Sequence, residues 1–130
     1  MKIFNGTGKA IRIVQFKEPP SNENIGRIKA GIAHEIRIQP NYLLNTSFEF
    51  HDKELNTFDT IAVKKIKDLK CSPVPNDYDL IIVNQDYALA CQLNGFSTDK
   101  MYQVGSEIVA YGLKPDEEKF YITTEYLIKV

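Results

Sequence analysis

Apolar and polar residues alternate along much of the chain, a pattern typical of β-strands with one covered face. In its N-terminal part the strand-like runs are residues 2–5, 10–16, 25–28 and 32–39. Gly6 and Gly8 separate the first two runs. Glycine adopts positive φ without steric cost, so these positions predict a tight turn and a first hairpin. Residues 29–31 would join the next two runs as a second pair, after a proline-containing surface loop.

The run at 32–39 alternates regularly and would place His34 on the same face as three isoleucines. We expect a partly buried histidine with a backbone partner there, and a ligand contact is the alternative. Residues 41–56 show only weak alternation and predict a loop that contains a short strand or turn. Residues 57–67 are rich in β-branched side chains and predict one strand.

Lysines at positions 64, 65 and 67 lie along that strand. Such lysines usually form a solvated edge that discourages edge-to-edge pairing, and a phosphate-facing patch is the alternative.

The run Leu-Ile-Ile-Val at 80–83 is continuously apolar, which indicates a strand covered on both faces. Asn84 follows as an N-cap candidate, with Asp86 in the first helical turn and Gly95 at the C-terminal stop. We therefore predict the principal helix at about residues 85–94. Its packed side would consist of Tyr87, Ala88, Cys91 and Leu93.

Three further strands are predicted at 101–105, 107–111 and 120–130, with a charged hairpin loop at 112–119. Together these elements predict an α+β fold, in which a mostly antiparallel, curved β-sheet packs against one principal helix. The length of 130 residues predicts a single domain, residues 1–130.

Composition narrows the possible functions. The net charge is -1, whereas proteins that bind duplex nucleic acid usually carry a basic excess. No run approaches the roughly 20 apolar residues of a membrane span, and the N-terminus lacks the apolar segment of a signal peptide. We therefore expect a cytoplasmic protein that binds neither membranes nor duplexes. Its two cysteines are expected as reduced thiols, Cys91 on the helix and Cys71 in a loop.

Groups that could perform catalysis are sparse. The chain contains no nucleophile elbow, phosphate-binding loop or dinucleotide-binding motif, and His34 and His51 lie in unrelated contexts. Asp77 and Asp79 could form a carboxylate pair, but the simpler interpretation is that both are solvated acidic residues of a loop. We therefore predict no enzyme activity, no metal and no cofactor.

Groups that could bind a ligand are better represented. Asn5, Thr7 and Lys9 gather at the first turn, and Asn84 and Asp86 stand at a helix N-terminus, where free N–H groups favour an anion. Arg37 could pair with a phosphate, and aromatic rings could stack on a base. The alternative is that these residues serve only the fold. The candidate ligand-binding residues are Asn5, Thr7, Lys9, Arg37, Asn84, Asp86, Tyr87, Phe96 and Tyr102.

Several of these segments resemble a family of small proteins common in phages and prophages. Those proteins begin with a strand and an Asn-x-Thr-Pro-His-x-Ile motif, and later carry a Pro-x-Pro segment, an Ile-Val-Ser strand end and a helix. Here residues 5–11 read Asn-Gly-Thr-Gly-Lys-Ala-Ile, residues 72–75 read Ser-Pro-Val-Pro and residues 81–84 read Ile-Ile-Val-Asn. Gly8 and Lys9 replace the Pro-His pair, so the family's histidine has no counterpart.

This resemblance implies a phage-encoded protein made in an infected bacterial cell. By analogy of class it suggests an anti-defence sponge, which holds a host immune nucleotide signal without cleaving it. We predict a homo-oligomer that sequesters a nucleotide-type signal, such as a cyclic ADP-ribose isomer or a cyclic oligonucleotide. Two alternatives stay open: an inhibitor that binds a host defence enzyme through a sheet edge or aromatic surface, and a minor structural protein of the virion.

Overall fold

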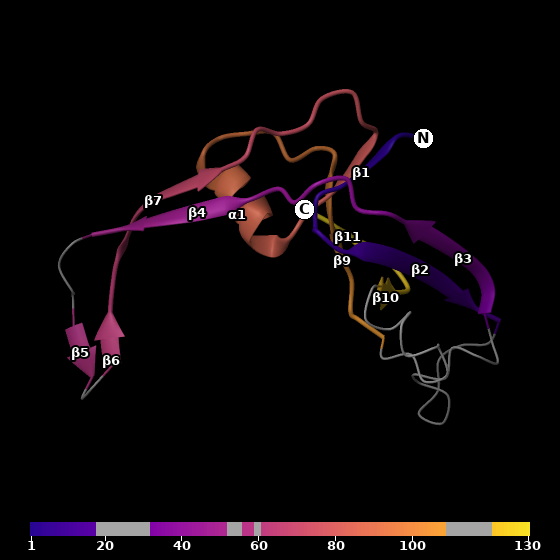
Figure 1. The fold of residues 1–130 in the computed structure, drawn as a ribbon, viewed down its shortest axis with the longest axis horizontal. Coiled ribbons are helices and arrows are strands. Elements are labelled where there is room, and N and C mark those ends of the chain that lie inside the picture. Colours follow the sequence, from indigo (N-terminus) through magenta and orange to yellow (C-terminus); the bar gives the residue numbers. More distant parts are fainter. Residues whose placement is uncertain (18–31, 52–55, 59–60, 109–120) are drawn as a thin grey trace.

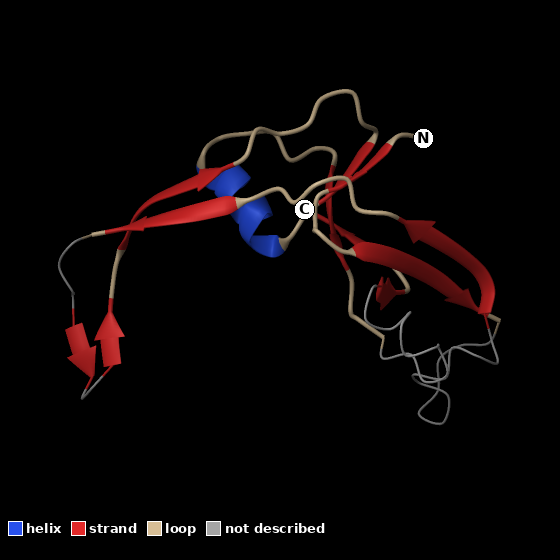
Figure 2. Ribbon diagram, in the orientation of Figure 1, coloured by secondary structure: helices blue, strands red, loops and turns tan. Residues whose placement is uncertain are grey.

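The computed structural model describes residues 1–17, 32–51, 56–58, 61–108 and 121–130. The expected strand at 25–28, the loop at 112–119 and most of the expected strand at 107–111 lie outside these residues. The described chain has one helix and many strands, which confirms an α+β, mostly β fold (Figures 1 and 2). Four of the seven strand pairings are antiparallel and three are parallel. The strands divide among four sheets and do not form one continuous curved sheet.

The strands and the helix have the following bounds: β1 (Ile3–Asn5), β2 (Ala10–Phe16), β3 (Ile32–Ile38), β4 (Thr46–Phe50), β5 (Asn56–Phe58), β6 (Ile61–Val63), β7 (Ile66–Cys71), β8 (Leu80–Ile82), α1 (Gln85–Leu93), β9 (Met101–Val104), β10 (Tyr121–Thr124) and β11 (Leu127–Lys129).

The largest sheet has the order β1-β8-β9-β11. β8 is parallel to both β1 and β9, and α1 connects β8 to β9 as a βαβ crossover. A crossover helix covers one face of the strands that it connects, which is consistent with the apolar run at residues 80–83. Ile81, Ile82 and Val83 are each at most 3% exposed, as the sequence predicted.

The first predicted hairpin is wrong. β1 belongs to the large sheet, whereas β2 lies between β10 and β3 in a separate three-stranded sheet. The tight turn itself is present, and Gly8 adopts the expected positive φ of +80°. The turn carries the chain from one sheet to the other because β1 finds its partner 77 residues away, in β8.

The expected strand at 57–67 is also wrong, because the structure divides the region among β5, β6 and β7. β4 and β7 pair antiparallel and form an arm that extends from α1, with β5 and β6 beyond its far end (Figure 1). We call the β4–β7 pair the arm. β4 confirms the short strand expected within residues 41–56. Lys64, Lys65 and Lys67 are exposed, as a solvated edge requires.

The expected long strand at 120–130 is interrupted. β10 pairs with β2, whereas β11 pairs with β9 in the other sheet. Between them the Thr124 hydroxyl lies 3.1 Å from the carbonyl oxygens of both Ser106 and Tyr126, and it stabilises the bend by donating its proton to one or the other. Leu127 breaks the alternation of apolar and polar residues at this point, which is a signal of the interruption in the sequence.

The helix prediction is confirmed. α1 ends at Leu93, Asn94 is its C-cap residue, and Gly95 has a φ of +76°. Tyr87, Ala88 and Cys91 are buried as expected, whereas Leu93 is 68% exposed and was wrongly placed on the packed side.

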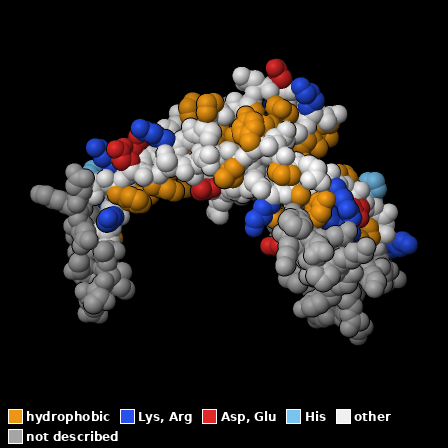
Figure 3. Space-filling model, in the orientation of Figure 1, with side chains coloured by type: hydrophobic (Ala, Val, Ile, Leu, Met, Phe, Trp, Pro, Cys, Tyr) orange, Lys and Arg blue, Asp and Glu red, His pale blue; other side chains and the backbone are white. Residues whose placement is uncertain are grey.

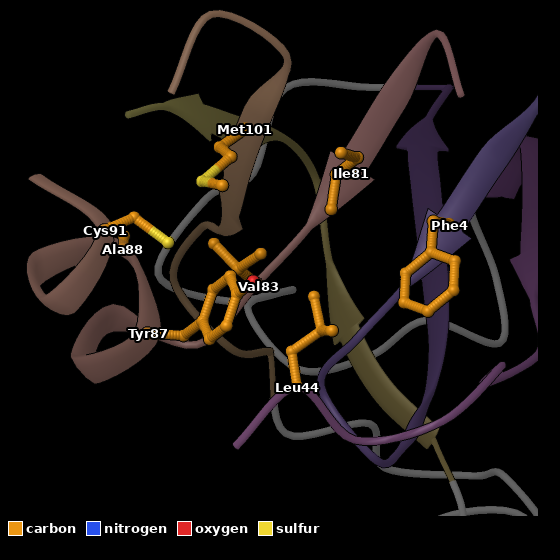
Figure 4. Close-up of a cluster of buried hydrophobic side chains, with 8 residues drawn as sticks. All are labelled: Phe4, Leu44, Ile81, Val83, Tyr87, Ala88, Cys91 and Met101. Atoms are coloured by element: carbon orange, nitrogen blue, oxygen red, sulfur yellow. The ribbon is translucent and has the colours of Figure 1, made fainter. Parts of the chain in front are cut away.

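The core lies between α1 and the face of the large sheet that carries Phe4, Ile81 and Met101 (Figure 4). Its buried members are Phe4, Leu44, Ile81, Val83, Tyr87, Ala88, Cys91 and Met101. Phe4 also makes edge-to-face contacts with the rings of Tyr42 (4.8 Å) and Tyr78 (5.0 Å).

The expected burial of His34 is wrong, because its side chain is exposed. On β3 the half-buried positions include Glu35, whereas Ile36 is 46% exposed. The reason lies on β2, where the nearly buried Arg12 (5% exposed) draws the Glu35 carboxylate to within 2.8 Å of its Nε atom. The ion pair therefore half-buries Glu35 on one face of β3, whereas Ile32 and Ile38 are half-buried on the other face, so neither face is fully covered.

Candidate functional site

The first turn and the start of α1 meet at one edge of the large sheet. β1 and β8 are parallel neighbours, with Asn5 opposite Ile82, so their carboxyl ends lie together. The Asn84 side chain donates from Nδ2 to the carbonyl oxygen of Thr7 (3.3 Å). Asn5, Thr7, Lys9, Asn84 and Asp86 thus belong to one region, which we call the switch edge.

Connections leave this edge toward different parts of the fold. The chain after β1 enters the three-stranded sheet, whereas the chain after β8 enters α1 and returns to β9. In open α/β sheets, ligands bind preferentially at the carboxyl edge where connections from adjacent parallel strands diverge. The sequence predicted the two groups of polar residues separately, and the β1–β8 pairing brings them together.

The buried side chain of Asn5 holds the backbone of the turn through hydrogen bonds. Its fully buried amide accepts hydrogen bonds at Oδ1 from the Thr7 N–H (3.1 Å) and the Thr7 hydroxyl (2.7 Å). Its Nδ2 group donates to the carbonyl oxygens of Lys9 (2.8 Å) and Ile38 (3.3 Å). All four contacts are internal, so in this structure the Asn5 and Thr7 side chains hold the backbone of the turn.

The exposed part of the switch edge is formed by Gly8, Lys9 and the first helical residues. Asn84 occupies the N-cap position with extended backbone, but its side chain makes no capping bond. The Asp86 carboxylate instead accepts a hydrogen bond at Oδ1 from the Tyr87 N–H in the first turn of the helix (2.9 Å). Its Oδ2 atom accepts from the Thr46 hydroxyl (2.6 Å). A carboxylate therefore stands at the positive end of the helix dipole.

Tyr87 cannot stack on a ligand, so that expectation is wrong. Its side chain is 0% exposed, and its hydroxyl donates to the Ser72 carbonyl oxygen (2.8 Å). Burial raises the pKa of the Tyr87 phenol well above its ordinary value of 10.0. The ring is a core residue on the inner face of α1 (Figure 4).

The two thiols lie close to Tyr87. Cys71 Sγ and Cys91 Sγ are 3.9 Å apart, and both cysteines are free. Cys71 is the last residue of β7 and does not lie in a loop, contrary to expectation. Burial, with the neighbouring Cys71 as a further cause, raises the pKa of the Cys91 thiol to about 11. The Cys91 thiol is therefore protonated at neutral pH.

Three other candidate residues lie away from the Thr7–Asn84 contact. Phe96 is 51% exposed but follows the C-terminal end of α1, so the length of a nine-residue helix, about 13 Å, separates it from Asn84. Tyr102 shares a row of the sheet with Asn5 two strands away, at about 10 Å, and its ring lies 5.4 Å from the Lys129 ammonium.

Arg37, the third, is engaged in an ion-pair cluster on the three-stranded sheet. Its guanidinium contacts the Glu35 carboxylate and lies 5.3 Å from the centre of the Tyr121 ring. Burial alone would raise the pKa of Glu35, but hydrogen bonds from Arg37 and Arg12 outweigh burial and lower it below 4.5. In return the carboxylate raises the pKa of Arg37, chiefly through the same hydrogen bond. Arg37 is thus held by Glu35, but it shares that one carboxylate with Arg12, so the cluster keeps a net positive charge.

A cavity that the sequence did not suggest lies at the opposite, amino ends of β8 and β9. Its volume is about 240 Å³, and its floor includes the buried side chains of Ile81 and Met101. Asp77 contributes to its wall with a positive φ of 66°, whereas Asp79 accepts a hydrogen bond at Oδ2 from the Lys2 N–H (2.7 Å). The two acids therefore do not act as a carboxylate pair. The Pro-x-Pro segment followed by Asn-Asp was the signal for this turn.

The described residues contain no group of three or more histidine, cysteine or acidic side chains arranged to hold a metal ion. No helix among them is both long and apolar enough to cross a lipid bilayer. Comparison with protein-family models, with curated proteins and with solved structures finds no match.

Proposed function

We propose that this protein is a non-enzymatic binding protein that holds a nucleotide-type ligand at the switch edge. The observation that carries the proposal is the contact between the turn after β1 and the start of α1, at the carboxyl ends of adjacent parallel strands. That position offers an ammonium group on Lys9, an amide on Asn84 and the first N–H groups of a helix. These are donor groups that suit a phosphate or pyrophosphate.

The Asp86 carboxylate opposes such a ligand. It stands at the same helix terminus, so a bound phosphate experiences repulsion from it as well as attraction from Lys9. We therefore expect Asp86→Asn to tighten binding by about 3- to 10-fold, because the amide oxygen still accepts the Tyr87 N–H while the negative charge is removed. Weaker binding in this variant would show that Asp86 does not face the ligand's phosphate.

In its biological role we propose a phage anti-defence sponge, which oligomerises in the infected cell and removes an immune signal by binding it. The resemblance to phage proteins and the scarcity of catalytic groups support this role. The test is incubation of the purified protein with cyclic ADP-ribose isomers and cyclic oligonucleotides, followed by removal of unbound ligand. Heating should then release the bound nucleotide chemically intact.

The matched variants are Lys9→Ala and Asn84→Ala, with Lys70→Ala as the control. Lys70 is an exposed lysine on the arm, so its replacement removes the same charge away from the switch edge. Retention should fall in the first two variants and stay unchanged in the third. If no nucleotide is retained at micromolar concentration, or if all three variants retain it equally, the switch edge is not a nucleotide site.

A second candidate function is inhibition of a host defence enzyme through protein contact. It is favoured by the apolar residues that α1 exposes, because Leu89 (50% exposed) and Leu93 (68% exposed) lie one turn apart near the exposed Phe96. A stoichiometric host protein that the parent chain captures, and that Leu93→Glu does not, would support this function. Recovery of the chain in purified particles would instead indicate a virion component.

A further inference from the structure

The arm carries an apolar surface that the described part of the chain leaves exposed. Near α1 the arm is packed, since Leu69 is 8% exposed. Farther out, Phe48, Phe50 and Ile66 are each 45–48% exposed, and the two phenyl rings stack with their centres 6.3 Å apart. Figure 3 shows hydrophobic side chains along this arm, beyond the helix. An isolated two-stranded sheet is marginally stable in water, so this part of the arm requires further packing.

The hydrogen bonds of the arm show which way its backbone groups point. The Ser72 N–H donates to the Asn45 carbonyl oxygen (2.9 Å), and the His51 N–H donates to the Lys65 carbonyl oxygen (3.0 Å). In an antiparallel ladder, bonded and non-bonded pairs alternate. Residues 45, 47, 49 and 51 therefore bond across to β7, and the backbone groups of residues 46, 48 and 50 point away from it.

Leu69, opposite Phe48, confirms this direction. Its N–H donates to Asp68 Oδ1 (2.9 Å), and its carbonyl oxygen accepts from Asn94 Nδ2 (2.8 Å), so neither group bonds to β4. These two side chains also protect the outer edge of β7. The outer edge of β4 has no such protection: among the described residues nothing pairs with the backbone of Phe48, and β4 contains no lysine or proline.

We propose that the open edge of β4 pairs antiparallel with the same edge of a second copy, about a two-fold axis at Phe48. This register places Phe48 opposite Phe48 of the second copy, and Thr46 opposite the second copy's Phe50. Each facing pair exchanges two backbone hydrogen bonds, because all three residues present their N–H and C=O groups outward. The two arms form one four-stranded sheet, with the phenyl rings in a row on one face.

Complementarity favours a second copy as the occupant. On the other face of the sheet, Ser47 lies opposite Glu49 of the second copy, so a hydroxyl donor meets a carboxylate on both sides of the axis. An axis at Glu49 would set two carboxylates against each other, and an axis at Ser47 would leave Phe50 without a partner. The register at Phe48 satisfies every outward backbone group and places no like charges together.

Five-residue edges bury less surface than a standard interface, so the dimer should dissociate on dilution. Sedimentation velocity over a range of concentrations should show a monomer–dimer equilibrium for the parent protein. Phe48→Pro removes the central outward N–H and leaves the arm's own ladder intact, because that N–H does not bond to β7. It should weaken the dimer by about 10- to 100-fold, since the central pair exchanges two hydrogen bonds.

Phe48→Leu is the matched control, which keeps the N–H group and an apolar side chain and should retain the dimer. Far-UV circular dichroism and the Tm of each variant confirm that the monomer is folded. The register is tested by a double variant, Ser47→Cys with Glu49→Cys, which should form a disulfide-linked dimer on oxidation. The single variants should not form this disulfide, because the one new thiol would then lie opposite Glu49 or Ser47 of the second copy. The parent, which has neither new thiol, should not form it either.

Three results would overturn the proposal. One is a parent protein that stays monomeric up to about 1 mM, where even a weak edge contact associates. Another is a dimer that Phe48→Pro leaves unchanged, which would place the interface elsewhere. The third is a parent that stays monomeric but loses a stoichiometric host-protein complex on Phe48→Pro, which would assign the edge to a strand of another protein.

Discussion

Asn5 is the residue whose replacement tests the architecture of the switch edge most directly. Its amide is fully buried and makes four hydrogen bonds within the turn and to β3. In Asn5→Ala the Thr7 N–H and the Ile38 carbonyl oxygen lose a side-chain partner. The Thr7 hydroxyl, which donates to Asn5 Oδ1 in the parent, can then donate to the Lys9 carbonyl oxygen 3.1 Å away, so these two groups are less affected.

The loss of stability in Asn5→Ala can be estimated from the polar groups that lose a partner. Each buried polar group left without a partner costs about 1–3 kcal/mol, and two groups are affected. Part of this cost is recovered where water reaches the turn, since Gly8 and Lys9 are exposed. We therefore expect Asn5→Ala to lower the free energy of unfolding by about 2–4 kcal/mol. Because β1 carries Asn5 and begins the large sheet, the loss should appear in global unfolding.

The assay is urea denaturation followed by circular dichroism, with Asn76→Ala as the control. Asn76 is an exposed asparagine in the loop before β8, and its replacement should change stability by less than about 0.5 kcal/mol. An unchanged m-value would show that the variants unfold from equally compact native states. If Asn5→Ala costs no more than Asn76→Ala, the amide does not hold the turn and the reasoning is refuted.

Asn5→Asp distinguishes the hydrogen-bond pattern from side-chain size. The carboxylate still accepts from Thr7, but it can no longer donate to the carbonyl oxygens of Lys9 and Ile38, and its charge is buried. This variant should be less stable than Asn5→Ala at pH 7. It should recover part of the loss in acid, where a protonated carboxyl donates one bond. Equal stability of Asn5→Asp and the parent at pH 7 would contradict the assigned orientation of the amide.

Other replacements test the remaining parts of the structure. Glu35→Gln should lower the free energy of unfolding by about 1–2 kcal/mol at pH 7. Because the pKa of Glu35 is lowered in the folded state, the stabilisation by its carboxylate is present above pH 4.5 and is lost as the pH falls through the folded-state pKa. The stabilities of parent and variant, followed by acid denaturation, should therefore converge at low pH. Cys91 should resist alkylation at pH 8 while the half-buried Cys71 reacts, because burial and the raised pKa of the Cys91 thiol, about 11, both suppress its thiolate form. Equal labelling of both thiols, measured by mass spectrometry, would contradict this. Gly105→Ala should cost about 1–3 kcal/mol, since an added Cβ would lie 2.6 Å from the Tyr126 carbonyl oxygen, and a Tm equal to that of the parent would refute this close approach.

Parts of the fold could be predicted because their causes are local. The limits of α1 follow from a buried strand run, Asn84, Asp86 and Gly95, which all lie within the helix or close to its ends in the chain. The positive φ of Gly8 follows from its neighbours in the same way. In the candidate site, the groups around Thr7 and Asn84 were each visible in the sequence as short polar clusters.

Other features of the fold depend on contacts with distant segments, which the local sequence pattern does not specify. β1 reads equally well as half of a hairpin with β2 or as a parallel neighbour of β8, because its alternation specifies a covered face and not a partner. The side chain of Tyr87 could have faced ligand or core, and the packing of α1 on the sheet placed it in the core. The half-burial of Glu35 likewise depends on Arg12, which lies on a neighbouring strand and forms an ion pair with it.

The residue pattern by itself thus determined where the helix begins and ends, which strand run is covered on both faces, and where the chain turns. Only the tertiary structure decided that β1 joins β8 and that the arm leaves one strand edge open. The physical reason is the range of the interactions. Backbone conformation and alternation are set by adjacent residues, whereas strand pairing is chosen by side-chain packing between segments far apart in the chain.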